Sequence, residues 1–274
     1  MEIRRILVNF ELDRFSPALA SCASALAQRF SAEVIGFSAA VPSPAFAGVH
    51  GAVAAASVYA EQRIEIETQL GAGREKFVQA MPAAIKSEWR QMVETPNRGL
   101  VEIGRAVDLV LASSPDASPW NPLRSLNVGD ALLSLGRPML LVSPGTQEIK
   151  ADRIVIGWKD TKEARRAVVD ALPFLKSASA VKLCAIEEGD FAHAKPSVED
   201  VLHWLQRHDV NATSDIVPKE YEGLSATLDK ARRDFGADLV VTGAYGHSRL
   251  QEWFLGGMTR DLLETPISNR FMSN

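Results

Sequence analysis

The sequence lacks the motifs that mark several common enzyme chemistries. It has no GxxxxGK[ST] phosphate loop, no GxSxG nucleophile elbow and no HExxH zinc motif. His203 and His208 lie five positions apart, a spacing that does not stack two side chains on one helix face. These absences argue against a P-loop NTPase, a serine hydrolase and a zinc enzyme.

Cysteine is also scarce, and the chain has no surplus of positive charge. The only two cysteines, Cys22 and Cys184, sit among apolar neighbours, and no CxxC occurs. They are typical of small core residues in the reducing cytoplasm. The formal net charge of −4 and the pI near 5.8 argue against a general nucleic-acid-binding protein, which would carry a basic face.

No stretch predicts a leader or a membrane span. The N-terminus has acidic residues where a signal peptide would be apolar. The longest run of small and apolar residues, 39–60, contains two prolines and a histidine and lacks large aliphatic side chains. We expect a long loop there instead of a membrane helix.

The chain repeats itself once. The segment from Val107 aligns without a gap on the segment from Ala237, a shift of 130 positions (237 − 107 = 130). A repeat of this length indicates two copies of one domain, because solenoid repeats are far shorter. We predict domains at residues 1–145 and 152–274, joined through the polar segment 144–151.

Each copy alternates strand and helix. In the second copy we expect strands near 153–158, 180–187, 212–217, 238–242 and 267–272, and helices near 161–176, 196–208, 222–235 and 257–264. In the first copy the weakest expected strand, the third, lies at EWRQMVE. This order predicts an α/β fold of two tandem doubly wound domains, each a five-stranded parallel sheet ordered 3-2-1-4-5 with helices on both faces.

Four glycines follow the fourth strand of the second copy. Ligands of such sheets lie beyond the carboxyl ends of the strands where the strand order reverses, here between strands 1 and 4. We expect Gly243 and Gly246 to turn with positive φ and to admit a ligand closely. The amides of Gly256 and Gly257, ahead of a helix, suit an anion, and Thr259 adds a hydroxyl. No activated nucleophile accompanies them, so the segment is predicted to hold phosphate and not to attack it.

The spacing of three of these glycines resembles the signature of the universal stress protein family, Gly-x-x-Gly followed by nine residues and Gly. The segment IVIGWKDTKEARRAVVDALPFL is similar to the first strand and helix of its tandem members. The likeness covers the second copy and, more faintly, the first. It implies a cytoplasmic stress-response sensor or regulator that binds ATP, or AMP or ADP, with or without Mg²⁺. The residues it assigns to the nucleotide are Gly157, Trp158, Lys159, Asp160, Ile186, Gly243, Gly246, His247, Gly256, Gly257, Met258 and Thr259.

The second copy departs from the family pattern at two places. Gly257 stands where the family has Ser or Thr, which keeps the amide and loses a hydroxyl. Lys159 stands where the family has Asp at the end of strand 1. Either Asp160 takes that role or the base and ribose contacts differ, and Lys159 could instead neutralise a phosphate. His247 could reach a phosphate or lie in solvent.

The first copy has lost the glycine signature. Ser113, Asp116 and Leu126 occupy the three shifted glycine positions. A carboxylate repels phosphate, and leucine cannot replace a glycine that needs positive φ. We therefore predict that the first copy does not bind ATP in the same manner.

Two other functions stay open at this point. The alternative is a scaffold that binds no nucleotide and acts through protein partners; a weak ATPase ranks last because no catalytic base is apparent. We expect no nucleic-acid or membrane partner. In the family, final strands commonly pair across copies, which hides an exposed edge, so we expect an internal pseudo-dimer. Homodimerisation of the whole chain stays open.

Overall fold

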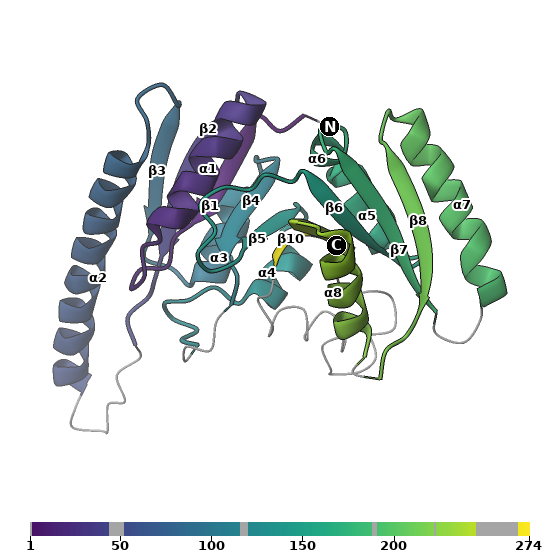
Figure 1. The fold of residues 1–274 in the computed structure, drawn as a ribbon. Coiled ribbons are helices and arrows are strands. Elements are labelled where there is room, and N and C mark those ends of the chain that lie inside the picture. The colour runs from purple at the N-terminus through teal and green to yellow at the C-terminus, as the bar shows by residue number, and fades with distance from the viewer. Residues whose placement is uncertain (1, 44–51, 116–119, 188–190, 222, 245–267) are drawn as a thin grey trace.

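The computed structural model describes residues 2–43, 52–115, 120–187, 191–221, 223–244 and 268–274, which form one ten-stranded sheet flanked by helices (Figure 1). The strands are β1 (Arg5–Asn9), β2 (Glu33–Ala39), β3 (Ser87–Met92), β4 (Leu109–Ser113), β5 (Met139–Val142), β6 (Arg153–Trp158), β7 (Ala180–Glu187), β8 (Ala212–Pro218), β9 (Leu239–Gly243) and β10 (Asn269–Ser273). The helices are α1 (Pro17–Phe30), α2 (Ala52–Ala80), α3 (Pro96–Gly104), α4 (Val128–Ser134), α5 (Lys162–Asp170), α6 (Leu172–Leu175), α7 (Phe191–Arg207) and α8 (Leu224–Phe235).

The strand order confirms the expected fold class. The sheet runs β3-β2-β1-β4-β5-β10-β9-β6-β7-β8, so each half has the order 3-2-1-4-5. Neighbours within a half are parallel, and β5 and β10 are antiparallel. The two halves are thus related by a pseudo-twofold arrangement about the middle of the sheet.

The two final strands form the seam between the halves, as expected. Phe271 of β10 lies opposite Leu140 of β5. Asn269 explains why a polar residue begins the last strand: its Oδ1 accepts hydrogen bonds from the Ser143 amide at 3.0 Å and from the Thr146 hydroxyl at 3.2 Å. One side chain of the second half therefore satisfies polar groups at the end of the first.

Two aspartates at equivalent positions of the repeat accept the same kind of hydrogen bonds, from backbone amides at the start of strand 1 of their half. The Asp108 carboxylate accepts hydrogen bonds from the amides of Arg4 and Arg5, at 2.8 and 2.9 Å. The Asp238 carboxylate accepts from the amides of Asp152 and Arg153, at 3.1 and 3.2 Å. Each aspartate precedes strand 4 of its half and ties it to the start of strand 1, which gives a physical reason for the repeated Asp-Leu-Val.

The helices cover the sheet in two layers. Side chains of α1, α2, α5, α6 and α7 join the sheet in one apolar core that runs through both halves. On the opposite face α3 and α4 cover the first half, and α8 packs on the second half in a separate cluster. The continuous core supports the seam from one side of the sheet.

The helix starts follow the expected capping chemistry. Ser16 caps α1 by accepting from the Leu19 amide at 3.1 Å, with Pro17 as the first helical residue. Thr161 caps α5 by accepting from the Ala164 amide at 3.3 Å. These short polar side chains fix where two of the helices begin.

Three expected boundaries were wrong. The helix expected at 161–176 is divided into α5 and α6, because Pro173 lacks the amide that a continuous helix needs. Helix α7 begins before 196, and Pro196 lies inside it. The loop expected over 39–60 gives way to α2 at Ala52, since its alanine-rich sequence has high helix propensity.

The two cysteines are buried, free thiols, and we expect them to react slowly in the folded protein. Burial, with the charge of Glu148 adding to it, raises the pKa of the Cys22 thiol to about 11. Burial and the charge of Asp215 do the same for Cys184, whose pKa is also about 11. Each lies two units above the ordinary value of 9.0, so the thiolate fraction at pH 8 falls roughly 100-fold.

Timed alkylation with iodoacetamide at pH 8, read by mass spectrometry, measures this. Labelling should be slow in buffer and fast in guanidinium. The folded pKa lies above the unfolded one, so these thiols contribute stability that is present below pH 9 and lost as the pH rises through about 11. Rapid labelling of the folded protein at either cysteine would contradict the burial.

Candidate functional site

The strand order reverses at two places, one in each half. In the second half β6 lies between β7 and β9, with Gly157 opposite Thr242 at the carboxyl end. In doubly wound sheets ligands bind beyond the carboxyl ends of the strands at such a reversal. This is the place at which the sequence predicts a nucleotide.

The predicted site divides between described residues and others. Gly157, Trp158, Lys159, Asp160, Ile186 and Gly243 belong to the described part of the chain. Gly246, His247, Gly256, Gly257, Met258 and Thr259 lie outside the described residues, so their roles stay predictions.

Gly243 corrects one prediction. It ends β9, and its φ is not among the positive values of the described glycines. A Cβ at this position would lie 2.5 Å from the Ala164 nitrogen and 2.6 Å from the Glu163 carbonyl carbon. Glycine is needed here because strand 4 is pressed against the first turn of α5, not because the backbone turns with positive φ.

Gly157 has a similar steric reason. A Cβ there would lie 3.0 Å from side-chain carbons of both Leu228, on α8, and Thr242, on β9. The Thr242 side chain is buried, and its hydroxyl has no hydrogen-bond partner. A buried hydroxyl without a partner carries a free-energy cost, so a donor or acceptor brought to this corner would relieve it.

The last residue of β6 and the two residues that follow it direct their side chains differently. The Trp158 side chain is buried in the core that includes α5 and α7, and its Nε1 donates to the Ser197 hydroxyl at 3.3 Å. Lys159 is exposed. Asp160 is exposed too, and its carboxylate accepts two hydrogen bonds from Arg165, at 2.9 and 2.7 Å. Any contact of Trp158 with a ligand beside the sheet would therefore come from its backbone.

The described site residues fall on the two faces of the sheet. Gly157 and Thr242 face α8, and Ile186 is half-buried on that face against the α8 cluster. Trp158 and Gly243 face the α5 side. Gly157, Thr242 and Ile186 form an apolar corner with one hydroxyl group. Such a corner fits an apolar ring such as a nucleobase, with the hydroxyl available to a polar group of the ligand.

Sequence reasoning missed Glu163. This first-turn residue of α5 has a side chain that is 2% exposed, its Oε2 has no hydrogen-bond partner, and Lys162 Nζ lies 3.6 Å from Oε1. Acidic residues are common in first turns of helices and usually face solvent, so nothing in the sequence marks this one as buried. It lies next to Gly243, and its charge would oppose a phosphate placed directly on the α5 face.

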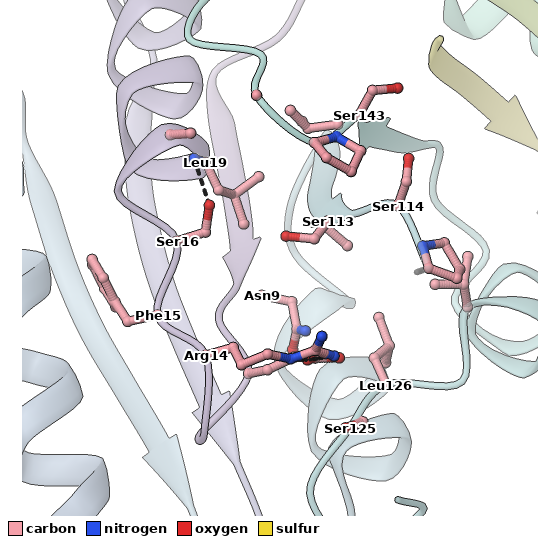
Figure 2. Close-up of a pocket in the computed structure, with 18 of the residues that line it drawn as sticks. Asn9, Arg14, Phe15, Ser16, Leu19, Ser113, Ser114, Ser125, Leu126 and Ser143 are labelled. Carbon is pink, nitrogen blue, oxygen red and sulfur yellow. Dashed lines mark hydrogen bonds and ion pairs between the residues drawn. The ribbon is translucent and has the colours of Figure 1, made fainter. Parts of the chain in front are cut away.

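The first half has a cavity of about 420 Å³ at the carboxyl ends of β1, β4 and β5 (Figure 2). Ser113 and Leu126, which stand at two of the shifted glycine positions, both line it. Leu126 is buried and packs in the core beneath α4. Its side chain fills space that a glycine would leave open.

Among the described residues no helix is long and apolar enough to cross a membrane. No group of three or more histidine, cysteine, aspartate or glutamate side chains is arranged to hold a metal ion there.

The fold matches solved structures even though no protein-family model matches the sequence and no curated protein is significantly similar to it. A universal stress protein from Archaeoglobus fulgidus DSM 4304 matches with a TM-score of 0.73 and 13% identity, over 100% of this chain and 99% of that one. A functionally unknown protein from Pseudomonas aeruginosa PAO1 matches with a TM-score of 0.59 and 14% identity, over 99% of this chain and 92% of that one. The protein thus has the fold of a universal stress protein, which confirms the resemblance at the level of the fold.

Proposed function

We propose that the protein is a cytoplasmic universal stress protein that binds an adenine nucleotide in its second half and acts as a sensor or regulator. The observation that carries this proposal is the reversal of strand order between β6 and β9, in a sheet with the fold of universal stress proteins. The spaced glycines of the family signature begin at this reversal, with Gly243 at the end of β9. Ligands of doubly wound sheets gather at this reversal.

The base and ribose would use the corner that faces α8. Ile186 supplies an apolar surface at the end of β7, and the Thr242 hydroxyl supplies a polar group without a partner. Asp160 is available for a ribose hydroxyl because its present partner, Arg165, is held in an exposed ion pair. Such pairs contribute about 0–1 kcal/mol and can be exchanged for a ligand contact.

The phosphates would depend on amides of the glycine segment and on Lys159. Glu163 disfavours phosphate on the α5 face, so the phosphates are expected to extend away from the first turn of α5. A ligand there would touch the end of β9, and β9 pairs with the seam strand β10. Nucleotide binding in one half can therefore act on the junction of both halves, which suits a regulator.

Calorimetric titration with ATP and with AMP tests the proposal. We expect saturable binding, weakened at least about tenfold by Gly256→Val, which removes a glycine of the signature. The matched control is Leu126→Val, the same final residue at the equivalent position of the first half, with ATP affinity unchanged. Absence of heat with the wild-type protein, or equal affinity in Gly256→Val, would exclude this site and favour a scaffold that acts through protein contacts.

A further inference from the structure

The cavity of the first half has a polar wall that the fold does not use. Asn9 is the last residue of β1, is 5% exposed and lines the cavity. Figure 2 shows its side chain beside the Arg14 guanidinium, in the space between β1 and the segment carrying Leu126. A primary amide can both donate and accept hydrogen bonds, so this group fits a ligand that does both.

Two hydroxyl groups at the neighbouring strand ends add to this wall. Ser114 follows β4 and Ser143 follows β5, and neither hydroxyl has a hydrogen-bond partner. Both backbones are fixed, since the Ser114 amide donates to Val142 at 2.8 Å and the Ser143 amide donates to Asn269 at 3.0 Å. A serine hydroxyl turns about one bond, so either can face the cavity without moving the chain.

The charge of the cavity does not suit a phosphate. Among the described residues that line it, only Glu11 and Arg14 are charged, and their side chains pair at 2.8 Å. The start of α1 offers few amides, because Pro17 has none and the Leu19 amide is taken by the Ser16 cap. The cavity thus has no surplus positive charge, unlike a typical anion site.

Apolar side chains complete the lining. Phe15, Leu126, Val128 and Val142 line the same space. Phe15 is held by stacking on Phe10, with ring centroids 4.6 Å apart. A volume of about 420 Å³ lies within the range of small-molecule sites.

From these observations we propose that the first half binds an uncharged small molecule that carries hydroxyl or amide groups on a compact apolar frame. Asn9 holds its polar edge, and the hydroxyls of Ser114 and Ser143 supply further contacts. The ligand differs from the nucleotide proposed for the second half in that a phosphate weakens its binding. The two halves would then sense two different molecules across one seam.

Saturation-transfer NMR with matched pairs of probes tests this. The neutral probes are adenosine, uridine and methyl glucoside, and their charged partners are AMP, UMP and glucose 6-phosphate. We expect at least one neutral probe to bind at millimolar or lower concentration, and Asn9→Leu to weaken it roughly 5- to 100-fold. In the Gly256→Val protein, whose proposed nucleotide site is impaired, its phosphorylated partner should bind roughly fivefold or more weakly, because Glu11 adds repulsion and Arg14, the one cation among the described lining residues, is paired with it.

Two variants keep the outcome clear. Ser113→Trp fills the cavity from an exposed position and should abolish the same signal without a change in the core. Gly256→Val alters only the second half and should leave that signal intact, which separates this site from the proposed nucleotide site. The proposal is overturned if no neutral probe binds, if a phosphorylated probe binds the first half more tightly, or if Asn9→Leu and Ser113→Trp leave binding unchanged.

Discussion

Replacement of Gly243 by valine is expected to destabilise the second half by about 3 kcal/mol or more, because the new side chain has no space. A Cβ at this position meets backbone atoms of α5 at 2.5 and 2.6 Å, closer than folded proteins allow. Side chains can change rotamer to relieve such a contact, whereas the first turn of a capped helix cannot. Helix α5 would have to move away from β9 and β10, both of which it covers.

Equilibrium unfolding in guanidinium, followed by circular dichroism, measures this effect. The matched control is Gly71→Ala in α2, where an added Cβ has nothing within 4 Å. That change should stabilise the protein by about 0.5–1 kcal/mol, since alanine is favoured over glycine inside a helix. If Gly243→Val were as stable as the wild-type protein, the close packing of β9 on α5 would be wrong.

Gly243 has a structural role that is independent of any ligand. The first glycine of the motif is explained by packing between strand 4 and α5, without any ligand. A loss of nucleotide binding in Gly243→Val would therefore reflect a damaged fold. Variants at Gly256 are the informative ones for the proposed site.

The fold was predictable because its signals are local and occur twice. Apolar runs such as those of β6 and β9 predict buried parallel strands, and Ser16 and Thr161 predict helix starts. The gapless shift of 130 between Val107 and Ala237 predicts that both halves share one topology.

The site was harder to predict because side-chain direction depends on contacts distant in sequence. The sequence does not show that Trp158 turns into the core beside Ser197, or that Glu163 is buried. Nor does it show that Asn9 lines a cavity with residues more than one hundred positions away, such as Ser114 and Ser143. These features arise only when strand ends are brought together by the sheet.

The seam between the halves is the second place where one substitution should have a large effect. Phe271 of β10 is fully buried and lies opposite Leu140 of β5. Its ring meets Phe174 of α6 at 5.7 Å between centroids, and Phe174 meets Phe30 of α1 at 5.1 Å. One row of aromatic rings therefore joins the seam strand to helices of both halves.

Replacing Phe271 by alanine is expected to cost about 3–5 kcal/mol, because the ring is removed from a closed core that cannot collapse around the gap. The matched control is Tyr221→Ala, an aromatic side chain that is 101% exposed, with a change within about 0.5 kcal/mol. Guanidinium unfolding read by tryptophan fluorescence reports on both halves, since Trp89 lies in β3 and Trp204 in α7. A loss below about 1 kcal/mol in Phe271→Ala would show that the seam is not packed as described, and that the halves are joined chiefly by strand pairing.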